Sequence, residues 1–191
     1  MKMAELDELI QRAISAETET DKIEFKEEFD TGSTASWCEI VKDVVAIANS
    51  GGGVIIFGLD DNGNPVGKNV SNIVALDPAQ IVDKVSKYTG IQFADFRLVE
   101  CKKNDHRIAV LRIFESPIPM IFTKPGTYPV AGGRQKSAFS RGTVYFRHGA
   151  KSEPGNQIDL RRVIERQIIS RRDSWLANIK KVIEAPLGSQ L

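Results

Sequence analysis

The chain has 191 residues, of which 41% are hydrophobic and 27% charged, as is typical of a single globular domain with its own core. Its formal net charge is only +1, but the charges are unevenly distributed. Residues 1–100 hold 9 Lys and Arg against 18 Asp and Glu, whereas residues 101–191 hold 17 against 7. An acidic half could hold a metal ion and a basic half could hold phosphates, although sequence halves interleave in a fold and their fields can cancel.

The cysteines and histidines argue against a zinc site. Cys38 and Cys101 have no CxxC spacing, and His106 and His148 are isolated in the sequence. The sequence opens without a signal-peptide pattern, and no apolar run approaches the roughly 18 residues of a membrane span. We therefore expect a reduced, cytoplasmic protein with no zinc and no membrane partner.

Hydrophobic periodicity predicts alternating helices and strands followed by a basic C-terminal helix. In chain order we expect a helix over residues 4–16, a strand over 22–29, a helix from the Ser36–Glu39 capping box to Gly51–Gly53, and a buried strand over Val54–Leu59. A helix over 78–87 and a hairpin of strands 96–102 and 107–114 should follow. The rest should be a long loop over 115–140 with room for a short strand at Met120–Phe122, a strand over 142–147, and a helix over 159–183 broken near 170–173.

These elements predict an α+β fold: a mixed β-sheet with helices packed mainly on one face, plus a C-terminal helical extension. We place the folded domain at residues 1–155 and the helical segment at residues 156–191, which could lead into a further domain.

The glycine-rich run does not have the order of a nucleotide-binding loop. A phosphate-cradling loop follows a strand and opens a helix, whereas Gly51–Gly53 follows a helix and opens a strand. A tight connection that needs positive φ explains the run better. We therefore expect no bound nucleotide.

Carboxylates at strand ends are candidates for a metal site. Glu19 and Glu24 lie five residues apart, with Glu24 on the first strand, and Asp60 and Asp61 end the buried strand. Such carboxylates suit a hard cation such as Mg²⁺ or Mn²⁺, which assists phosphodiester cleavage. Each acid also has an ordinary alternative, because Glu24 can pair with a lysine two positions away and the Asp pair can simply form a turn.

Three motifs together resemble the AlbA-like domain of Schlafen proteins. They are Glu19-x(4)-Glu24-Phe-Lys26, a helix into Ala48-Asn-Ser-x-Gly-Gly, and Gly58-Leu-Asp-Asp61-x-Gly, while Tyr145–Ser152 resembles the closing strand of the family. The resemblance covers about residues 15–150. The same domain opens many bacterial proteins of poorly defined role, long labelled as DNA-binding or ATP-binding.

The resemblance implies a ribonuclease site. For the ribonucleases among the Schlafen proteins, the resemblance implies cleavage of transfer RNA and ribosomal RNA with a metal ion that two glutamates and one aspartate hold. These positions match Glu19, Glu24 and Asp61, which we take as metal ligands and catalytic residues, with Mg²⁺ or Mn²⁺ as the cofactor. Schlafens contain two such lobes and a zinc site, whereas this chain has one lobe and no such ligands. A homodimer could rebuild the two-lobed groove.

Basic residues would complete this site. Lys26 shares a strand face with Glu24 and could neutralise a phosphate oxygen, with an ion pair to Glu24 or Glu28 as an equal alternative. Phosphate contacts would come from four residues of the closing strand region and, more weakly, from an arginine row on the C-terminal helix: Arg141, Arg147, His148 and Lys151, then Arg161, Arg162 and Arg166.

Three functions remain open on the sequence. Few aromatic residues lie among these cations, which favours recognition of shape and phosphates over base stacking. We predict a metal-dependent endoribonuclease domain that cleaves structured RNA such as tRNA. The alternative is a non-catalytic nucleic-acid-binding module of a larger bacterial regulatory or defence protein. A protein-interaction domain whose cations are only solvated is a third interpretation.

Overall fold

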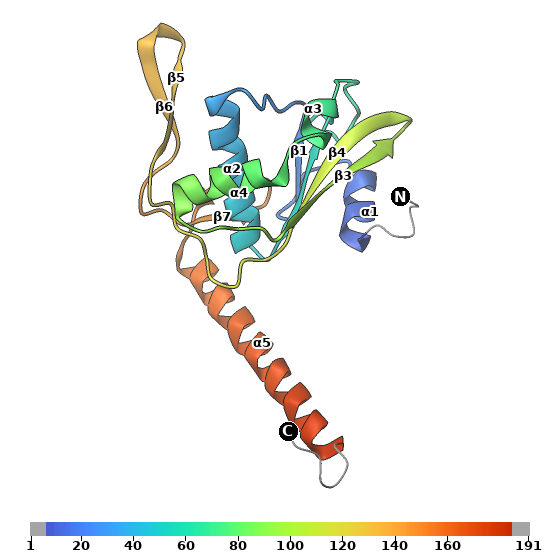
Figure 1. Ribbon diagram of the computed structural model, residues 1–191, viewed down its shortest axis with the longest axis vertical. Coiled ribbons are helices and arrows are strands. Elements are labelled where there is room, and N and C mark those ends of the chain that lie inside the picture. The colour runs from blue at the N-terminus through green and yellow to red at the C-terminus, as the bar shows by residue number, and fades with distance from the viewer. Residues whose placement is uncertain (1–6, 185–191) are drawn as a thin grey trace. The chain divides into compact units, whose positions relative to one another are not determined.

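The computed structural model describes residues 7–184 and divides the chain into two units, Met1–Gly155 and Asn156–Leu191 (Figure 1). The first unit contains every strand of the described residues. In the second unit the described residues form one helix, α5 (Gln157–Glu184). This helix is continuous, so the predicted break near residues 170–173 is wrong.

A four-stranded mixed sheet forms the centre of the first unit. Its strand order is β1-β2-β4-β3, with β1 parallel to β2 and the other two pairs antiparallel. This confirms the predicted α+β fold and the β3–β4 hairpin. The strands are β1 (Ile23–Lys26), β2 (Gly53–Phe57), β3 (Phe96–Lys103) and β4 (His106–Ile113).

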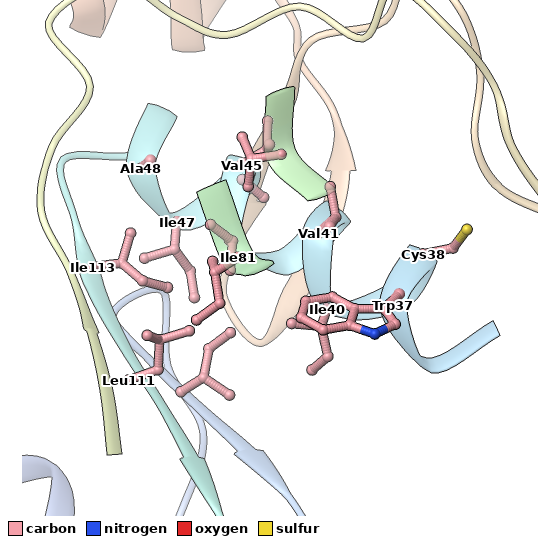
Figure 2. Packing of buried hydrophobic residues seen from close by; sticks show 14 of the residues in the cluster. Trp37, Cys38, Ile40, Val41, Val45, Ile47, Ala48, Ile81, Leu111 and Ile113 are labelled. Atoms are coloured by element: carbon pink, nitrogen blue, oxygen red, sulfur yellow. The ribbon is translucent and has the colours of Figure 1, made fainter. Parts of the chain in front are cut away.

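Helices cover both faces of the sheet, but most lie on one face. The side chains of β2 alternate, so Val54 and Ile56 pack with helix α1 (Glu8–Ser15), whereas Ile55 and Phe57 face the larger core. Figure 2 shows Leu111 and Ile113 of β4 at one side of the side chains drawn from this larger core. The helices that contribute to it are α2 (Thr34–Asn49), α3 (Ser71–Val74) and α4 (Pro78–Thr89).

Both ends of α2 have a clear local cause. The helix begins at Thr34 because the Ser33 side chain accepts a hydrogen bond from the Ser36 amide, so the predicted cap at Ser36 is wrong. At its other end Gly51 and Gly52 take φ values of 92° and 81°, as the predicted tight connection requires. At Gly53 a Cβ would lie 2.6 Å from the Lys22 carbonyl oxygen, so only glycine allows β1 to approach this closely.

The segment predicted as a long loop contains a two-stranded hairpin instead. Strands β5 (Gly126–Val130) and β6 (Arg134–Phe139) pair antiparallel and project from the rest of the first unit (Figure 1). We call residues 126–139 the ribbon. Met120 and Phe122, predicted as a short strand, have no regular structure but are 2% and 0% exposed in the core.

A second hairpin closes the first unit. It pairs β7 (Tyr145–His148) with β8 (Lys151–Pro154). The buried amide of Asn49 at the end of α2 donates to the carbonyl oxygens of Met120 and Tyr145 at 3.1 and 3.0 Å. These bonds fix β7 and the segment before the ribbon against α2.

A buried charge cluster and a basic ribbon as candidate sites

Four charged side chains meet where β1, α2 and β7 come together. Ile23 and Phe25 of β1 point into the α1 core, so the alternating Glu24 and Lys26 point toward α2. Glu24, Asp43 and Arg147 are only 5%, 3% and 4% exposed. We call Glu24, Lys26, Asp43 and Arg147 the charge cluster.

The charge cluster is neutral and closed by its own ion pairs. Nη1 of Arg147 lies 2.6 Å from Oε2 of Glu24, without the alignment of a hydrogen bond. Nζ of Lys26 donates to Oε1 of Glu24 and lies 3.2 Å from Oδ2 of Asp43. Two carboxylates therefore face two cations, which is the compensation that buried charges require.

Hydrogen bonds extend the cluster to neighbouring elements. The Ser152 hydroxyl of β8 donates to Oδ1 of Asp43 at 2.7 Å and accepts from Nη1 of Arg147 at 3.2 Å. Nη2 of Arg147 donates to the Thr20 carbonyl oxygen at 3.1 Å, and its backbone amide donates to the Ser50 hydroxyl at 2.8 Å. Arg147 thus connects the β7–β8 hairpin to the segment before β1 and to the end of α2.

The electrostatics of the cluster keep its members interdependent. Burial and the nearby Asp43 carboxylate raise the pKa of Glu24, while Lys26 and Arg147 act in the opposite direction. Burial alone would lower the pKa of Lys26, but Asp43 and Glu24 raise it above its ordinary value. The Lys26 ammonium therefore stays charged through the range in which proteins fold.

The other two predicted metal ligands serve local backbone groups or lie in a turn. Oε1 of Glu19 accepts the Phe25 amide at 2.9 Å, on the side of β1 that has no neighbouring strand. Asp60 accepts the amides of Asn62 and Asn64 at 2.9 and 2.8 Å, which is the turn alternative. Asp61 follows it in the same turn and is exposed.

These residues do not fit a metal ion as they stand. Within residues 7–184, no three Asp, Glu, His or Cys side chains come together as a possible metal site. The predicted set of Glu19, Glu24 and Asp61 is therefore not assembled. The physical reason is that the Glu24 oxygens already face two cations and that Glu19 accepts a hydrogen bond from the Phe25 backbone amide. For Lys26, the ion-pair alternative is the one observed.

The four predicted phosphate contacts of the closing strand region differ in their exposure to solvent. The Arg147 side chain is 1% exposed, so it cannot reach a nucleic acid, and this prediction is wrong. Nδ1 of His148 lies 3.1 Å from Oε2 of Glu153 on β8. Arg141 and Lys151 are exposed, as a backbone contact requires.

The sequence reasoning missed the ribbon. Residues 116–152 contain six Lys and Arg and no Asp or Glu, and this gap in the acids is the signal that could have revealed it. Arg134 and Lys136 lie on β6 and are exposed. The tip at Ala131–Gly133 is exposed as well.

Glu39 of α2 fixes the base of the ribbon. Its Oε1 accepts the Tyr128 hydroxyl at 2.6 Å and lies 3.4 Å from Nζ of Lys136, while Oε2 accepts from Lys42 at 2.5 Å. Burial would raise the pKa of Glu39, but the bonds from Lys42 and Tyr128 lower it to about 2. A cleft of about 450 Å³ lies beside this anchor, lined by residues that include Lys26, Phe29, Ser36, Glu39, Tyr128 and Lys136.

The fold and these sites define a small α+β module with a basic hairpin arm. The sequence matches the family model described as Schlafen, AlbA_2 over residues 19–156, which is most of the chain. The protein belongs to this family, as the motif resemblance predicted. No helix within the described range is long and apolar enough to cross a membrane.

Two individual proteins resemble this chain more distantly. It is 25% identical over 164 residues to a protein of Ureaplasma parvum serovar 3 named "Uncharacterized ATP-binding protein UU034". That match covers 82% of this chain but only 45% of the relative, so the chain spans less than half of the relative's length. The solved structure of the DIP2311 protein from Corynebacterium diphtheriae matches 78% of this chain and 30% of its own, with 12% identity and a TM-score of 0.49. Similarity at that level supports no further argument.

Proposed function

We propose that this chain is a nucleic-acid-binding module whose main contact is the ribbon and the exposed cations beside it. The observation that carries the proposal is the acid-free segment 116–152, which presents Arg134 and Lys136 on a projecting hairpin. Arg141 and Lys151 add exposed positive charge after the ribbon. Lysine and arginine that neutralise phosphates supply most of the sequence-independent affinity for nucleic acids.

The shape of the ribbon supports the same conclusion. A two-stranded β-ribbon is narrow enough to enter the major groove of B-form DNA, whereas structured RNA offers a wide minor groove and its phosphates. The nearby aromatic residues are not available for base stacking, because Phe139, Tyr145 and Phe146 are at most 8% exposed. Contacts to phosphates, which position a protein without specifying sequence, therefore suit this surface.

The test is a binding titration with labelled tRNA and with a labelled DNA duplex at several salt concentrations. The triple variant Arg134→Glu/Arg141→Glu/Lys151→Glu should bind at least about tenfold more weakly, and its salt dependence should be shallower by about 0.7–0.9 logarithmic units per lost phosphate contact. The control is Arg97→Glu/Lys102→Glu, which reverses two exposed charges on β3. Equal losses in both variants, or binding that does not respond to salt, would rule out the ribbon and the cations beside it as the contact.

The predicted endoribonuclease activity can be followed in the same experiment. Total tRNA is incubated with the protein and Mn²⁺ or Mg²⁺, with and without EDTA. Fragments that depend on metal and disappear in Glu24→Gln would favour the ribonuclease. Binding without fragments favours the module that we propose.

The predicted homodimer also remains a prediction. Besides the two-lobed groove, the apolar segment Pro117–Phe122 is a candidate contact for it. Met120 and Phe122 of this segment belong to the protein's own core, whereas Ile118 and Ile121 are 79% and 50% exposed. Light scattering that gives the mass of one 21.1 kDa chain at micromolar concentration would exclude the dimer.

A further inference from the structure

The charge cluster has the arrangement of a cation site in which the cation belongs to the protein. Glu24 from β1 and Asp43 from α2 bring two carboxylates together, and Nζ of Lys26 contacts both of them. Arg147 supplies the second positive charge from the side of β7. Each carboxylate is at most 6% exposed, so water contributes little to its stabilisation.

We propose that Lys26, assisted by Arg147, occupies the place that a divalent cation would take between Glu24 and Asp43. In this chain the acidic centre is therefore a metal-independent connection that joins β1, α2 and the β7–β8 hairpin. The inference is independent of nucleic-acid binding, because it concerns only the buried cluster.

Charge balance is the first argument. The two carboxylates carry two negative charges, and Lys26 and Arg147 carry two positive charges, so the cluster is neutral without any ion from solution. A divalent cation that joined the intact cluster would leave two uncompensated positive charges in a buried site, which is strongly unfavourable.

Geometry is the second argument. An ammonium group has three donors, and Lys26 directs it to carboxylates on two different elements. The remaining oxygen of Asp43 accepts the Ser152 hydroxyl, and Oε2 of Glu24 faces Arg147. Every carboxylate oxygen of the cluster thus already faces a protein group, which leaves none for a metal.

The experiment removes the built-in cation. Lys26→Met keeps most of the side-chain volume and leaves the cluster with one net negative charge. Thermal melting and isothermal titration with Mn²⁺ alone should show no effect on the unmodified protein. For Lys26→Met, Mn²⁺ should raise the melting temperature by several degrees. Lys26→Met should also bind Mn²⁺ at least about tenfold more tightly than the unmodified protein does.

The matched control is Lys68→Met. Lys68 also lies between two carboxylates, at 3.5 Å from Glu27 and 2.8 Å from Glu28, but this group is on the surface. Exposed carboxylates stay hydrated, so Lys68→Met should gain little affinity for Mn²⁺ and little stability from it. Stabilisation of the unmodified protein by Mn²⁺ that is lost in Glu24→Gln would overturn the proposal, as would a folded Lys26→Met that responds no more than Lys68→Met.

A second variant covers the case in which Lys26→Met does not fold. The double variant Lys26→Met/Asp43→Asn removes one charge of each sign and leaves the Glu24–Arg147 pair intact. It should fold and should not respond to Mn²⁺. A folded double variant beside an unfolded single variant supports the pairing of Lys26 with Asp43, and failure of both to fold overturns it.

Discussion

Arg134 and Arg147 come from the same acid-free segment but lie in opposite surroundings. Arg147 on β7 faces Glu24 and Thr20 and is buried, whereas Arg134 begins the second strand of a ribbon and is exposed. The difference comes from carboxylates that are far away in sequence. A cation next to a core needs a buried acid as partner, while Arg134, next to the tip of a two-stranded arm, is exposed to solvent. Net charge along the sequence therefore overstates the cations available to a nucleic acid.

The largest expected loss of stability follows from replacing the buried arginine, Arg147. Arg147→Met leaves Glu24 and Asp43 with Lys26 as their only cation and removes the bond to Thr20. Breaking a buried pair from one side costs about 3–5 kcal/mol, and we expect a loss of that order in the free energy of unfolding. Urea denaturation at neutral pH, followed by circular dichroism, measures it.

The matched change on the exposed side is Arg134→Met. Surface substitutions of this kind usually change stability by less than about 0.5 kcal/mol. Similar losses for the two variants would mean that the charge cluster contributes no more to stability than an exposed arginine does.

The sequence predicted the central sheet well because its signals are strong. The apolar run after the glycines and the two alternating stretches of the β3–β4 hairpin leave few alternatives for burial. The ribbon was missed because Pro129, Gly132 and Gly133 are typical of loops and because Tyr128 and Phe139 are its only large buried side chains, too few to give an apolar pattern. Pairing along an exposed arm leaves little trace in hydrophobic periodicity.

Only part of the charge cluster was placed correctly from the sequence, and its chemistry was not. Alternation placed Glu24 and Lys26 on the same face of β1, which the structure confirms. Asp43 was overlooked, although a charged residue next to Val41 and Val44 on the buried face of α2 was a visible signal. The partner Arg147 lies on the last strand pair, and no spacing rule connects it to Glu24.

An intermediate effect is expected where the ribbon joins the core. A Cβ on Gly126 would lie 2.3 Å from the ring of Phe139, which stacks on Phe122 at a centroid distance of 3.8 Å. Gly126→Ala should therefore cost about 1–3 kcal/mol through overpacking, and it should also weaken nucleic-acid binding by displacing the ribbon. Urea denaturation and the binding titration measure the two effects.

Gly132→Ala provides the contrast at the tip. A Cβ there meets no atom within 4 Å, but φ is +80°, so the cost is limited to backbone strain of about 1–2 kcal/mol and does not involve the core. If Gly126→Ala left the free energy of unfolding unchanged, the ring of Phe139 would not be confined as described.

A smaller effect is expected for Glu39, which fixes the ribbon to α2. Its pKa in the folded protein is about 2, against an ordinary value of 4.5. The unfolded chain therefore binds more protons between these values, so the stabilisation from Glu39 is complete above about pH 4.5 and is lost as the pH falls toward 2. The side chain is 30% exposed, so we expect a contribution on the order of 1 kcal/mol rather than the full value of the shift.

Glu39→Gln should remove this dependence. The difference in unfolding free energy between the unmodified protein and Glu39→Gln should be constant from pH 7 to pH 5 and should shrink between pH 4.5 and pH 2. Tyr128→Phe removes one of the bonds that lower the pKa of Glu39, so its profile should lie between the two. Urea titrations across this range make the measurement. Parallel profiles for the unmodified protein and Glu39→Gln would show that the ribbon base is held by the packing of Tyr128 and Phe139 and not by the charge on Glu39.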